Sequence, residues 1–382
     1  MKIFRYPERE QWDEIIERPR LDLTRLNETV STVLCDIRQR GDEAVKEYEL
    51  KFDKAELVNL AVTEEEMDEA EGLVSNELRD AIILAHHNIK VFHISQRFVG
   101  PKVKTQEGVT CWQKSVAIER VGLYIPGGTA PLFSTVLMLA TPAKIAGCKE
   151  IVLCTPPNKE GKVHPAILVA ARIAGVSKIY KIGGVQAIGA MAYGTETVPK
   201  VYKIFGPGNQ YVMAAKQHVS LDEVAIDMPA GPSEVCVLAD ETANAAFVAA
   251  DLLSQAEHGS GWEKSLLATP SRAFAEEVKR KMLEQTKTLS RKALIQRVFD
   301  RGGVLIAATP TLSDGLELVN RFAPEHFEIM CKDAMKLMKG VRCAGAVFAG
   351  AWTPESAGDF VAGPSHVLPT GGAANGIPLK AT

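Results

Sequence analysis

The strongest constraint on the fold is a regular alternation of short apolar strands and helices between about residues 124 and 232. Glycine turns stand where a strand passes into a helix, as in Gly183-Gly184 and Gly206-Pro207-Gly208-Asn209. This alternation is typical of a parallel sheet, because parallel strands need a helix-length crossover between them. The pattern resumes after Gly259, so we predict an α/β protein. The expected strands are 150–154, 178–182, 201–205, 234–238, 264–268, 303–307 and 327–330.

The bulk properties exclude several classes of protein. At 382 residues the chain exceeds one ordinary hydrophobic core, so two domains or more are expected. A net charge of -3 gives no reason to expect a nucleic-acid or membrane partner, and no apolar run reaches membrane-spanning length. The N-terminus lacks the apolar core of a signal peptide, and the seven cysteines form no CxxC pair. We therefore expect a cytoplasmic protein with free thiols.

The first hundred residues are expected to be mostly helical. Apolar residues from Leu26 to Ile37 mark an amphipathic helix that stops at Gly41. Thr63 and Glu66 have the spacing of a capping box, and a long helix is expected over 76–97. Alternation over 109–125 suggests a strand that ends at the turn Pro126-Gly127-Gly128.

A possible metal site lies in the stretch 225–259. The turn Pro229-Ala230-Gly231-Pro232 and a short strand precede a helix that Asp240 or Thr242 could cap and that should end at Gly259. Gln255 and His258 are three residues apart, so both should project from one helix face. An amide oxygen and an imidazole there can hold a divalent metal, but a solvated helix cap is the other interpretation.

Two further stretches carry acid–base chemistry. Glu325 and His326 follow Pro324 directly before an expected strand, where a carboxylate and an imidazole could work as a pair or occur by chance. Residues 352–366, rich in glycine and proline, predict an irregular loop that carries Glu355, Asp359 and His366. A hard oxygen ligand at Asp359 would complement Gln255 and His258.

The glycine turns after the strands also favour an anionic ligand. Backbone N–H groups at the start of a helix bind phosphates, which makes a dinucleotide the obvious candidate. The usual fingerprint is incomplete, because Gly206 and Gly208 are present but Tyr211 replaces the third glycine. Nucleotide binding and simple strand–helix turn chemistry both remain open on spacing alone.

Several long motifs in a fixed order resemble the L-histidinol dehydrogenase family. The similarity covers essentially the whole chain, and the motifs that carry it are RVGLYIPGG at 120–128, KIFGPGN at 203–209, AGPSE at 230–234, DLLSQAEHG at 251–259, PEH at 324–326 and ESAGD with SHVLPT at 355–370. The resemblance implies two incomplete Rossmann-like domains, one inserted in the other. It implies an N-terminal helical extension at 1–22, a main domain of 23–123 with 233–375, an inserted domain at 124–232, and the start of a truncated C-terminal dimerisation tail at 376–382.

The activity implied by the resemblance is the oxidation of L-histidinol through L-histidinal to L-histidine with two NAD, by a zinc-containing homodimer. Glu325 and His326 correspond to the catalytic pair. His326 would take the alcohol proton, and Glu325 would activate water in the second oxidation. The resemblance implies that Gln255, His258 and Asp359 bind both zinc and substrate. Ser233, His326 and His366 are implied to bind the substrate alone. The implied NAD contacts are Tyr124, Gln186 and Asn209.

The C-terminus departs from the family pattern. Members of the family continue past the HVLPT-like motif and supply a further zinc-ligand histidine and a substrate-binding glutamate across the dimer. No histidine follows His366 in this chain. With three zinc ligands left, we expect weaker binding of zinc and substrate than in a complete member.

Three other interpretations compete. A related dehydrogenase could oxidise another polar alcohol with the same NAD residues, although Ser233 and His366 disfavour it. Aldehyde oxidation through Cys111 or Cys148 is disfavoured because neither thiol has a neighbouring base that would lower its pKa. A non-catalytic dimerisation or binding remnant would have no need of the intact Glu325 and His326 pair.

Overall fold

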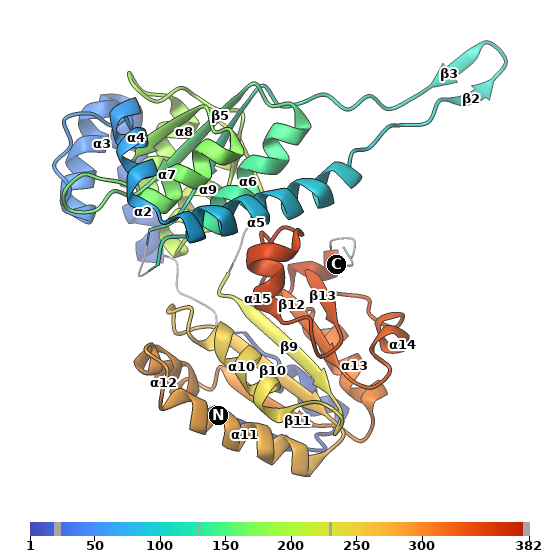
Figure 1. Ribbon diagram of the computed structural model, residues 1–382. Coiled ribbons are helices and arrows are strands. Elements are labelled where there is room, and N and C mark those ends of the chain that lie inside the picture. The colour runs from blue at the N-terminus through green and yellow to red at the C-terminus, as the bar shows by residue number, and fades with distance from the viewer. Residues whose placement is uncertain (19–23, 128–129, 229–230, 377–382) are drawn as a thin grey trace. The chain divides into compact units, whose positions relative to one another are not determined.

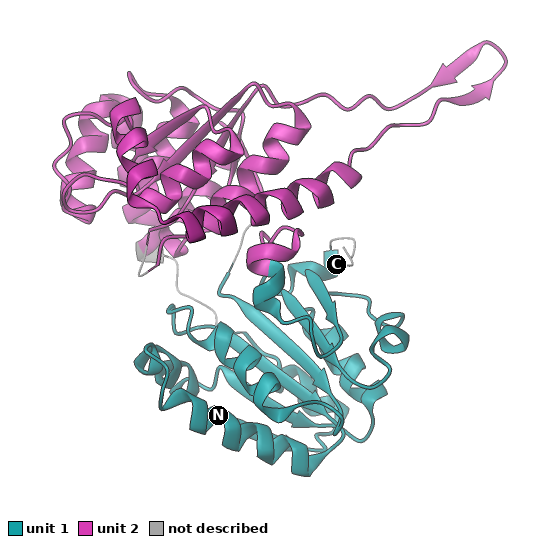
Figure 2. Cartoon of the chain, in the orientation of Figure 1, with its two compact units in different colours: residues 1–21, 228–358, 368–382 teal, residues 22–227, 359–367 magenta. Residues whose placement is uncertain are grey.

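The protein is described from a computed structural model, which describes residues 1–18, 24–127, 130–228 and 231–376. The chain forms two compact units, each built around one parallel sheet (Figures 1 and 2). Unit 1 comprises 1–21, 228–358 and 368–382, and unit 2 comprises 22–227 and 359–367. Residues 377–382 of the tail predicted at 376–382, Gly128 and the first half of the 229–232 turn lie outside the described residues.

The sheet of unit 2 has five parallel strands in the order β6-β5-β4-β7-β8. Leu123 of the central strand pairs with Leu153 on one side and Phe205 on the other, and all three are apolar because helices cover both faces. The strands are β4 (Arg120–Tyr124), β5 (Glu150–Thr155), β6 (Lys178–Lys181), β7 (Lys203–Phe205) and β8 (Ala225–Ile226).

Two apolar clusters cover the faces of this sheet. One joins the strands to α2 (Thr24–Arg40), α3 (Asp42–Tyr48), α8 (Gly184–Tyr193) and α9 (Gln210–Ser220). The other joins them to α4 (Glu64–Leu73), α5 (Asn76–Ser95), α6 (Phe133–Ala146) and α7 (Pro165–Ala174). Five-residue turn η2 (Glu49–Asp53) continues α3.

The division of the chain differs from the predicted domain boundaries. Residues 23–123 were expected to join the C-terminal half, but α2 to α5 pack in unit 2. The apolar stripe of α2 explains this, since Val30, Val33 and Ile37 are buried in the cluster that contains α8 and α9.

The sheet of unit 1 has six parallel strands in the order β1-β11-β10-β9-β12-β13. Helices α10 (Ala245–Ala256), α11 (Arg272–Thr286) and α12 (Lys292–Asp300) cover one face, while α1 (Trp12–Ile15), α13 (Leu312–Phe322) and α14 (Ala334–Met338) cover the other. The strands are β1 (Lys2–Arg5), β9 (Glu234–Ala239), β10 (Lys264–Thr269), β11 (Val304–Ala308), β12 (His326–Met330) and β13 (Ala346–Ala349).

The chain start is not the helical extension that was expected. Residues 2–5 pair in register with β11, with Ile3 opposite Ile306, before a 3-10 turn η1 (Arg9–Gln11) and α1. Apolar Ile3 and Phe4 pack on opposite faces of the sheet, which favours a strand.

Most local signals are confirmed, with three corrections. The Thr63–Glu66 capping box is present. Residues 112–119 do not continue a strand, because β3 (Val109–Cys111) is followed by irregular backbone. Asn244 caps α10, since the Asp240 carboxylate instead accepts from the N–H of Thr242 in a preceding turn. The segment 355–362 is helical, as α15 (Glu355–Ala357) and η3 (Gly358–Ala362), and a 3-10 turn η4 (Ala373–Gly376) follows later.

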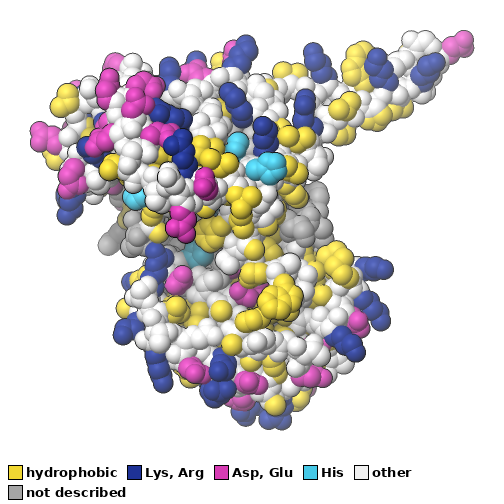
Figure 3. All heavy atoms as spheres, in the orientation of Figure 1, with side chains coloured by type: hydrophobic (Ala, Val, Ile, Leu, Met, Phe, Trp, Pro, Cys, Tyr) yellow, Lys and Arg dark blue, Asp and Glu magenta, His cyan; other side chains and the backbone are white. Residues whose placement is uncertain are grey.

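A two-stranded antiparallel hairpin of β2 (Val103–Gln106) and β3 extends from unit 2 (Figure 1). Its residues are exposed, and both basic and apolar side chains lie along this extension (Figure 3). Within the described ranges, no helix has the length and apolar character needed to cross a membrane.

Candidate active site

The predicted acid–base pair is anchored on one residue of the neighbouring strand. His326 begins β12, and its Nδ1 lies 3.1 Å from the carbonyl oxygen of Glu234 at the start of β9. The Glu325 carboxylate accepts from the Glu234 N–H at 3.1 Å. A backbone carbonyl only accepts hydrogen bonds, so Nδ1 carries the hydrogen and Nε2 of the neutral ring carries the lone pair. That tautomer presents a base at Nε2.

The buried Glu234 carboxylate is itself held by an ion pair with the half-buried Arg18. Arg18 donates to its two carboxylate oxygens, from Nε at 2.5 Å and from Nη2 at 2.9 Å, and the guanidinium carbon lies 4.0 Å from the Phe322 ring centre. Two parallel bonds between a guanidinium and a carboxylate have a defined geometry. The start of β9, on which the predicted acid–base pair is anchored, is therefore oriented by the N-terminal segment.

The predicted metal ligands at the end of α10 differ in burial. Gln255 is fully buried, and its Nε2 donates to Glu355. Its Oε1 is buried without a hydrogen-bond partner among the described residues. His258 lies two residues beyond Ala256, the last helical residue, and is exposed. The two side chains therefore do not share a helix face as predicted, because the helix ends between them.

The His258 ring is nevertheless oriented for a ligand. Its Nδ1 lies 3.1 Å from the Ser254 carbonyl oxygen, so Nδ1 donates and Nε2 keeps the lone pair. A histidine whose second nitrogen donates to a carbonyl has the arrangement of most metal-bound histidines. The buried amide oxygen of Gln255 and the Nε2 of His258 fit a divalent metal.

A group of buried carboxyls lies behind this turn. Glu355 accepts from the Ser254 hydroxyl at 2.9 Å, and its backbone N–H donates to Glu328 at 3.0 Å. Burial, together with the carboxylates of Asp251 and Glu355, raises the pKa of Glu328 well above its usual range. Burial also raises the pKa of Asp251 to about 6.

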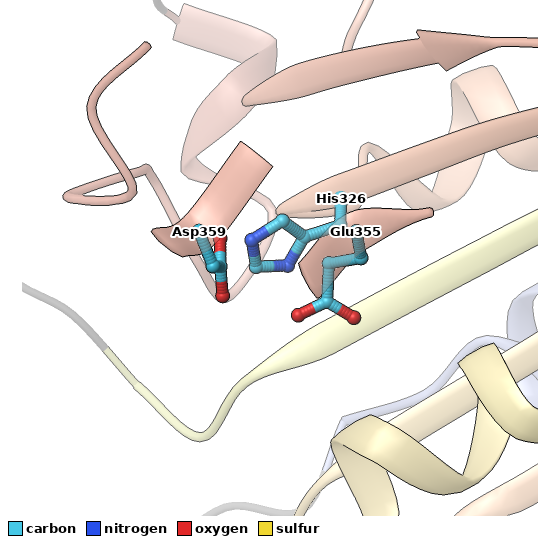
Figure 4. Close-up of side chains that lie close together, drawn as sticks. All are labelled: His326, Glu355 and Asp359. Carbon is cyan, nitrogen blue, oxygen red and sulfur yellow. The ribbon is translucent and has the colours of Figure 1, made fainter. Parts of the chain in front are cut away.

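Figure 4 shows three side chains that converge from three elements: His326 of β12, Glu355 of α15 and Asp359 of η3, which directly follows α15. One ligand atom of each lies within 4.8 Å of the others, which is a spacing that a metal ion can use. Two predicted site residues, His326 and Asp359, are thus brought together. Glu355 joins them although the sequence assigned it no role.

The remaining predicted substrate residues have protein partners. The Ser233 carbonyl accepts from the N–H of Lys264. His366 bonds through Nδ1 to the Asp359 carbonyl oxygen at 3.1 Å and through Nε2 to the Thr135 hydroxyl at 3.1 Å. Both nitrogens of its ring are engaged in this structure.

A cavity of about 1100 Å³ in unit 2 is lined by all three predicted NAD contacts, Tyr124, Gln186 and Asn209. The Tyr124 hydroxyl accepts from the N–H of Gly184, and burial raises its pKa, so the hydroxyl keeps its proton. Asn209 caps α9 by accepting from the N–H groups of Tyr211 and Val212. The volume and the two helix starts suit a dinucleotide.

An acidic pair that the sequence did not indicate lies beside this cavity: Asp53 is part of its lining, and Glu49 hydrogen-bonds to Gln186, which also lines it. Glu49 is fully buried and accepts from Gly183 N–H and from Gln186 Nε2, both at 2.8 Å. Burial, and secondarily the Asp53 carboxylate, raises the pKa of Glu49 to about 8. Gln186 Nε2 also donates to Asp53 at 3.3 Å. Both carboxylates therefore bind the NH₂ end of this amide, which fixes its orientation.

The structure offers no support for a thiol nucleophile. Burial raises the pKa of the Cys148 thiol, which disfavours the reactive thiolate. Cys111 lies on the exposed hairpin strand β3.

Comparison with known proteins identifies the family. A family model described as histidinol dehydrogenase matches residues 16–378. The chain belongs to the histidinol dehydrogenase family. It is therefore an oxidoreductase enzyme, and the resemblance predicted from its motifs is confirmed.

Family members are similar over nearly the whole of this chain, which spans somewhat more than four fifths of their own length. The histidinol dehydrogenase of Bacteroides fragilis is 60% identical, over 97% of this chain and 86% of the relative. That of Escherichia coli strain K12 is 46% identical, over 95% and 83% respectively. The crystal structure of histidinol dehydrogenase from Elizabethkingia anophelis has a TM-score of 0.95 at 45% identity, and the match covers 98% of this chain and 86% of that one. The α/β fold with two parallel sheets is thus confirmed.

Sequence reasoning missed Glu355 and Glu49, and a local signal existed only for Glu355. Glu355 and Asp359 are four residues apart, which places both on one side of a helical turn, but the glycines and prolines around them suggested a loop. Glu49 lies in a charged helical segment, where nothing local separates a buried carboxylate from a solvated one.

Proposed function

We propose that this member of the histidinol dehydrogenase family oxidises L-histidinol through L-histidinal to L-histidine, with zinc and two NAD, as a cytoplasmic homodimer of histidine biosynthesis. The observation that carries the proposal is the Glu325 and His326 pair, buried and anchored on the backbone of Glu234. The family match over residues 16–378 supports the substrate.

The roles of the chain's own residues follow from their hydrogen bonds. With Nδ1 bound to the Glu234 carbonyl, His326 accepts the proton of the alcohol at Nε2. NAD, when bound, takes the hydride. In the second half Glu325 takes a proton from the water that attacks the aldehyde. His326 then deprotonates the resulting diol, whose carbon gives up its hydride to the second NAD.

The metal would have a positioning role. Gln255, His258 and Asp359 would hold zinc, which anchors the imidazole and amine of the substrate so that its alcohol carbon stays beside His326. The unpartnered Gln255 Oε1 and the oriented His258 ring support the first two assignments. Ser233 and His366 complete the proposed substrate contacts, and Tyr124, Gln186 and Asn209 the NAD contacts.

An NAD-reduction assay tests the proposal. We expect L-histidinol to reduce two NAD per molecule, and a chelator to abolish this until Zn²⁺ is restored. A panel of other polar alcohols serves as the control for substrate. Turnover of another alcohol in preference to histidinol would favour a different dehydrogenase, and no turnover of any alcohol with metal restored would overturn the proposal.

A further inference from the structure

We propose that Glu355 is a positioning residue for the metal site, which orients the Gln255 amide and braces the turn that carries His258. The inference rests on the proposed metal ligands. It concerns contacts within unit 1 only, between α15 and the end of α10.

The first argument is the polarity of the amide. The two ends of a glutamine amide are nearly equal in size, so packing alone does not decide which end faces a metal. The Gln255 Nε2 donates to Glu355 Oε1, and a carboxylate can only accept. Turning the amide over would place two oxygens in contact. Glu355 therefore holds the amide with its carbonyl oxygen directed away from the carboxylate.

The second argument is the state of that carbonyl oxygen. Gln255 is fully buried, and Oε1 has no hydrogen-bond partner among the described residues. Buried polar atoms usually have a partner, so an unpartnered oxygen in a fixed orientation indicates a ligand. The amide oxygen can bind a divalent cation, whereas the NH₂ group of the amide cannot.

The third argument is that the same carboxylate supports the second ligand. Glu355 Oε2 accepts from the Ser254 hydroxyl at 2.9 Å, and the Ser254 carbonyl accepts from His258 Nδ1 at 3.1 Å. The Glu355 carboxylate thus contacts two consecutive residues, Ser254 and Gln255. Gln255 is a proposed ligand, and Ser254 fixes the tautomer of the other proposed ligand, His258. Glu355 is held in turn by its backbone N–H, which donates to Glu328.

A competing interpretation makes Glu355 a metal ligand itself, since it lies with His326 and Asp359 in the cluster of Figure 4. The two interpretations differ in what a glutamine at 355 does. Its amide oxygen can still accept from Gln255, so a positioning role survives in Glu355→Gln. A metal ligand at 355 would lose its negative charge in that variant, so the zinc affinity of Glu355→Gln would then fall well below that of the wild type.

The test is the affinity of the purified full chain for Zn²⁺, measured by competition with a chromophoric chelator. We expect Glu355→Ala to raise the zinc dissociation constant by about 10- to 100-fold, the usual range for outer-shell changes. Glu355→Gln should stay within about 5-fold of the wild type, because the acceptor remains. Glu257→Gln, which removes a carboxylate from the same turn, is the matched control and should leave the affinity within about 2-fold.

A double-mutant cycle separates positioning from direct ligation. In a Gln255→Ala background, Glu355→Ala should raise the dissociation constant further only by a small factor, because the amide it orients is gone. The absorption spectrum of the Co²⁺-loaded protein should change in the same way in Gln255→Ala and in Glu355→Ala. The double variant should show no additional change.

The outcomes overturn different statements. Equal losses in Glu355→Gln and Glu355→Ala, or additive losses in the cycle, would overturn the positioning role in favour of direct ligation. An unchanged zinc affinity in Glu355→Ala would overturn the inference while leaving the proposed function intact. Absence of zinc binding by the wild type would overturn the metal part of the proposed function and this inference with it.

Discussion

At the scale of single residues, the site depends on backbone groups of one residue as much as on side chains. Glu234 offers its N–H to Glu325 and its carbonyl to His326. Glu325 and His326, the proposed catalytic pair, are adjacent in sequence and both hydrogen-bond to the start of β9. Their proposed roles differ because one is an imidazole and the other a carboxylate. Glu325 Oε2 lies 3.7 Å from His326 Nδ1.

We expect Glu325→Gln to spare the first oxidation and to slow the second by about 10²- to 10⁴-fold, the range for loss of a general base. Glutamine still accepts from the Glu234 N–H, so the local structure should persist. Single-turnover measurement of NADH should then show one fast equivalent and one slow one, with L-histidinal trapped between them. Equal slowing of both steps would remove the water-activating role of Glu325.

The raised pKa of Glu49 predicts a pH dependence of stability. Because the folded pKa is about 8, above the unfolded value, the folded state binds the proton more tightly between about pH 4.5 and 8. The contribution of Glu49 to the free energy of unfolding therefore falls as pH rises through this window and levels off above it. Glu49→Gln keeps the acceptor for Gly183 and removes the titration.

Urea unfolding at a series of pH values measures this effect. The stability of Glu49→Gln relative to the wild type should increase from pH 5 to 8 and then stay constant. Glu160→Gln, at an exposed loop position, provides the control and should show no such trend. A pH-independent difference between Glu49→Gln and the wild type would contradict the prediction.

At the scale of elements, the glycine turn between β7 and α9 is built by a buried ion pair. Lys216 of α9 is fully buried, pairs with the Asp227 carboxylate and donates to the Gly206 carbonyl at 2.7 Å. Asp227 accepts from the Gly206 N–H at 2.8 Å. Gly206 has a φ of 130°, and a Cβ there would meet the Tyr124 backbone, so only glycine fits.

Removal of one partner of this pair should be strongly destabilising. We expect Lys216→Met to lower the free energy of unfolding by about 3–5 kcal/mol, since it leaves the Asp227 carboxylate buried without its cation. The double variant Lys216→Met/Asp227→Asn should recover part of the loss. Denaturant unfolding measures both, and equal stabilities of the single variant and the wild type would show that the pair is not buried as described.

At the scale of the whole molecule, each sheet joins segments that are far apart in sequence. In unit 1 the strand at residues 2–5 pairs with β11, 300 residues later, and Arg18 pairs with Glu234. The N-terminal segment is thus part of the core of unit 1, and Arg18 orients the strand that anchors the proposed catalytic pair.

We expect Arg18→Met to lower the free energy of unfolding by about 2–3 kcal/mol, because the buried Glu234 carboxylate loses its bidentate partner. Arg18→Lys keeps the charge but not the two parallel bonds, and should lie between Arg18→Met and the wild type. Thermal or denaturant unfolding compares the three proteins. Equal stability in all of them would indicate that the pair does not brace unit 1.

The sequence by itself determined the local structure and the family. Apolar periodicity places α2 and α5, turn chemistry places the glycine turns, and the ordered motifs point to the catalytic pair and the NAD contacts. These signals are readable because each depends on neighbours within one or two turns of the chain.

Only the tertiary structure decided which sheet α2 to α5 cover, and which side chains meet across the sheets. The apolar stripe of a helix fits either sheet, so periodicity does not select one. Glu355 reaches Gln255 across 100 residues, and Glu49 reaches Gln186 across 137. Such contacts are set by the register of whole strands and helices, and the polarity of a buried amide or the pKa of a buried carboxyl exists only once they are in place.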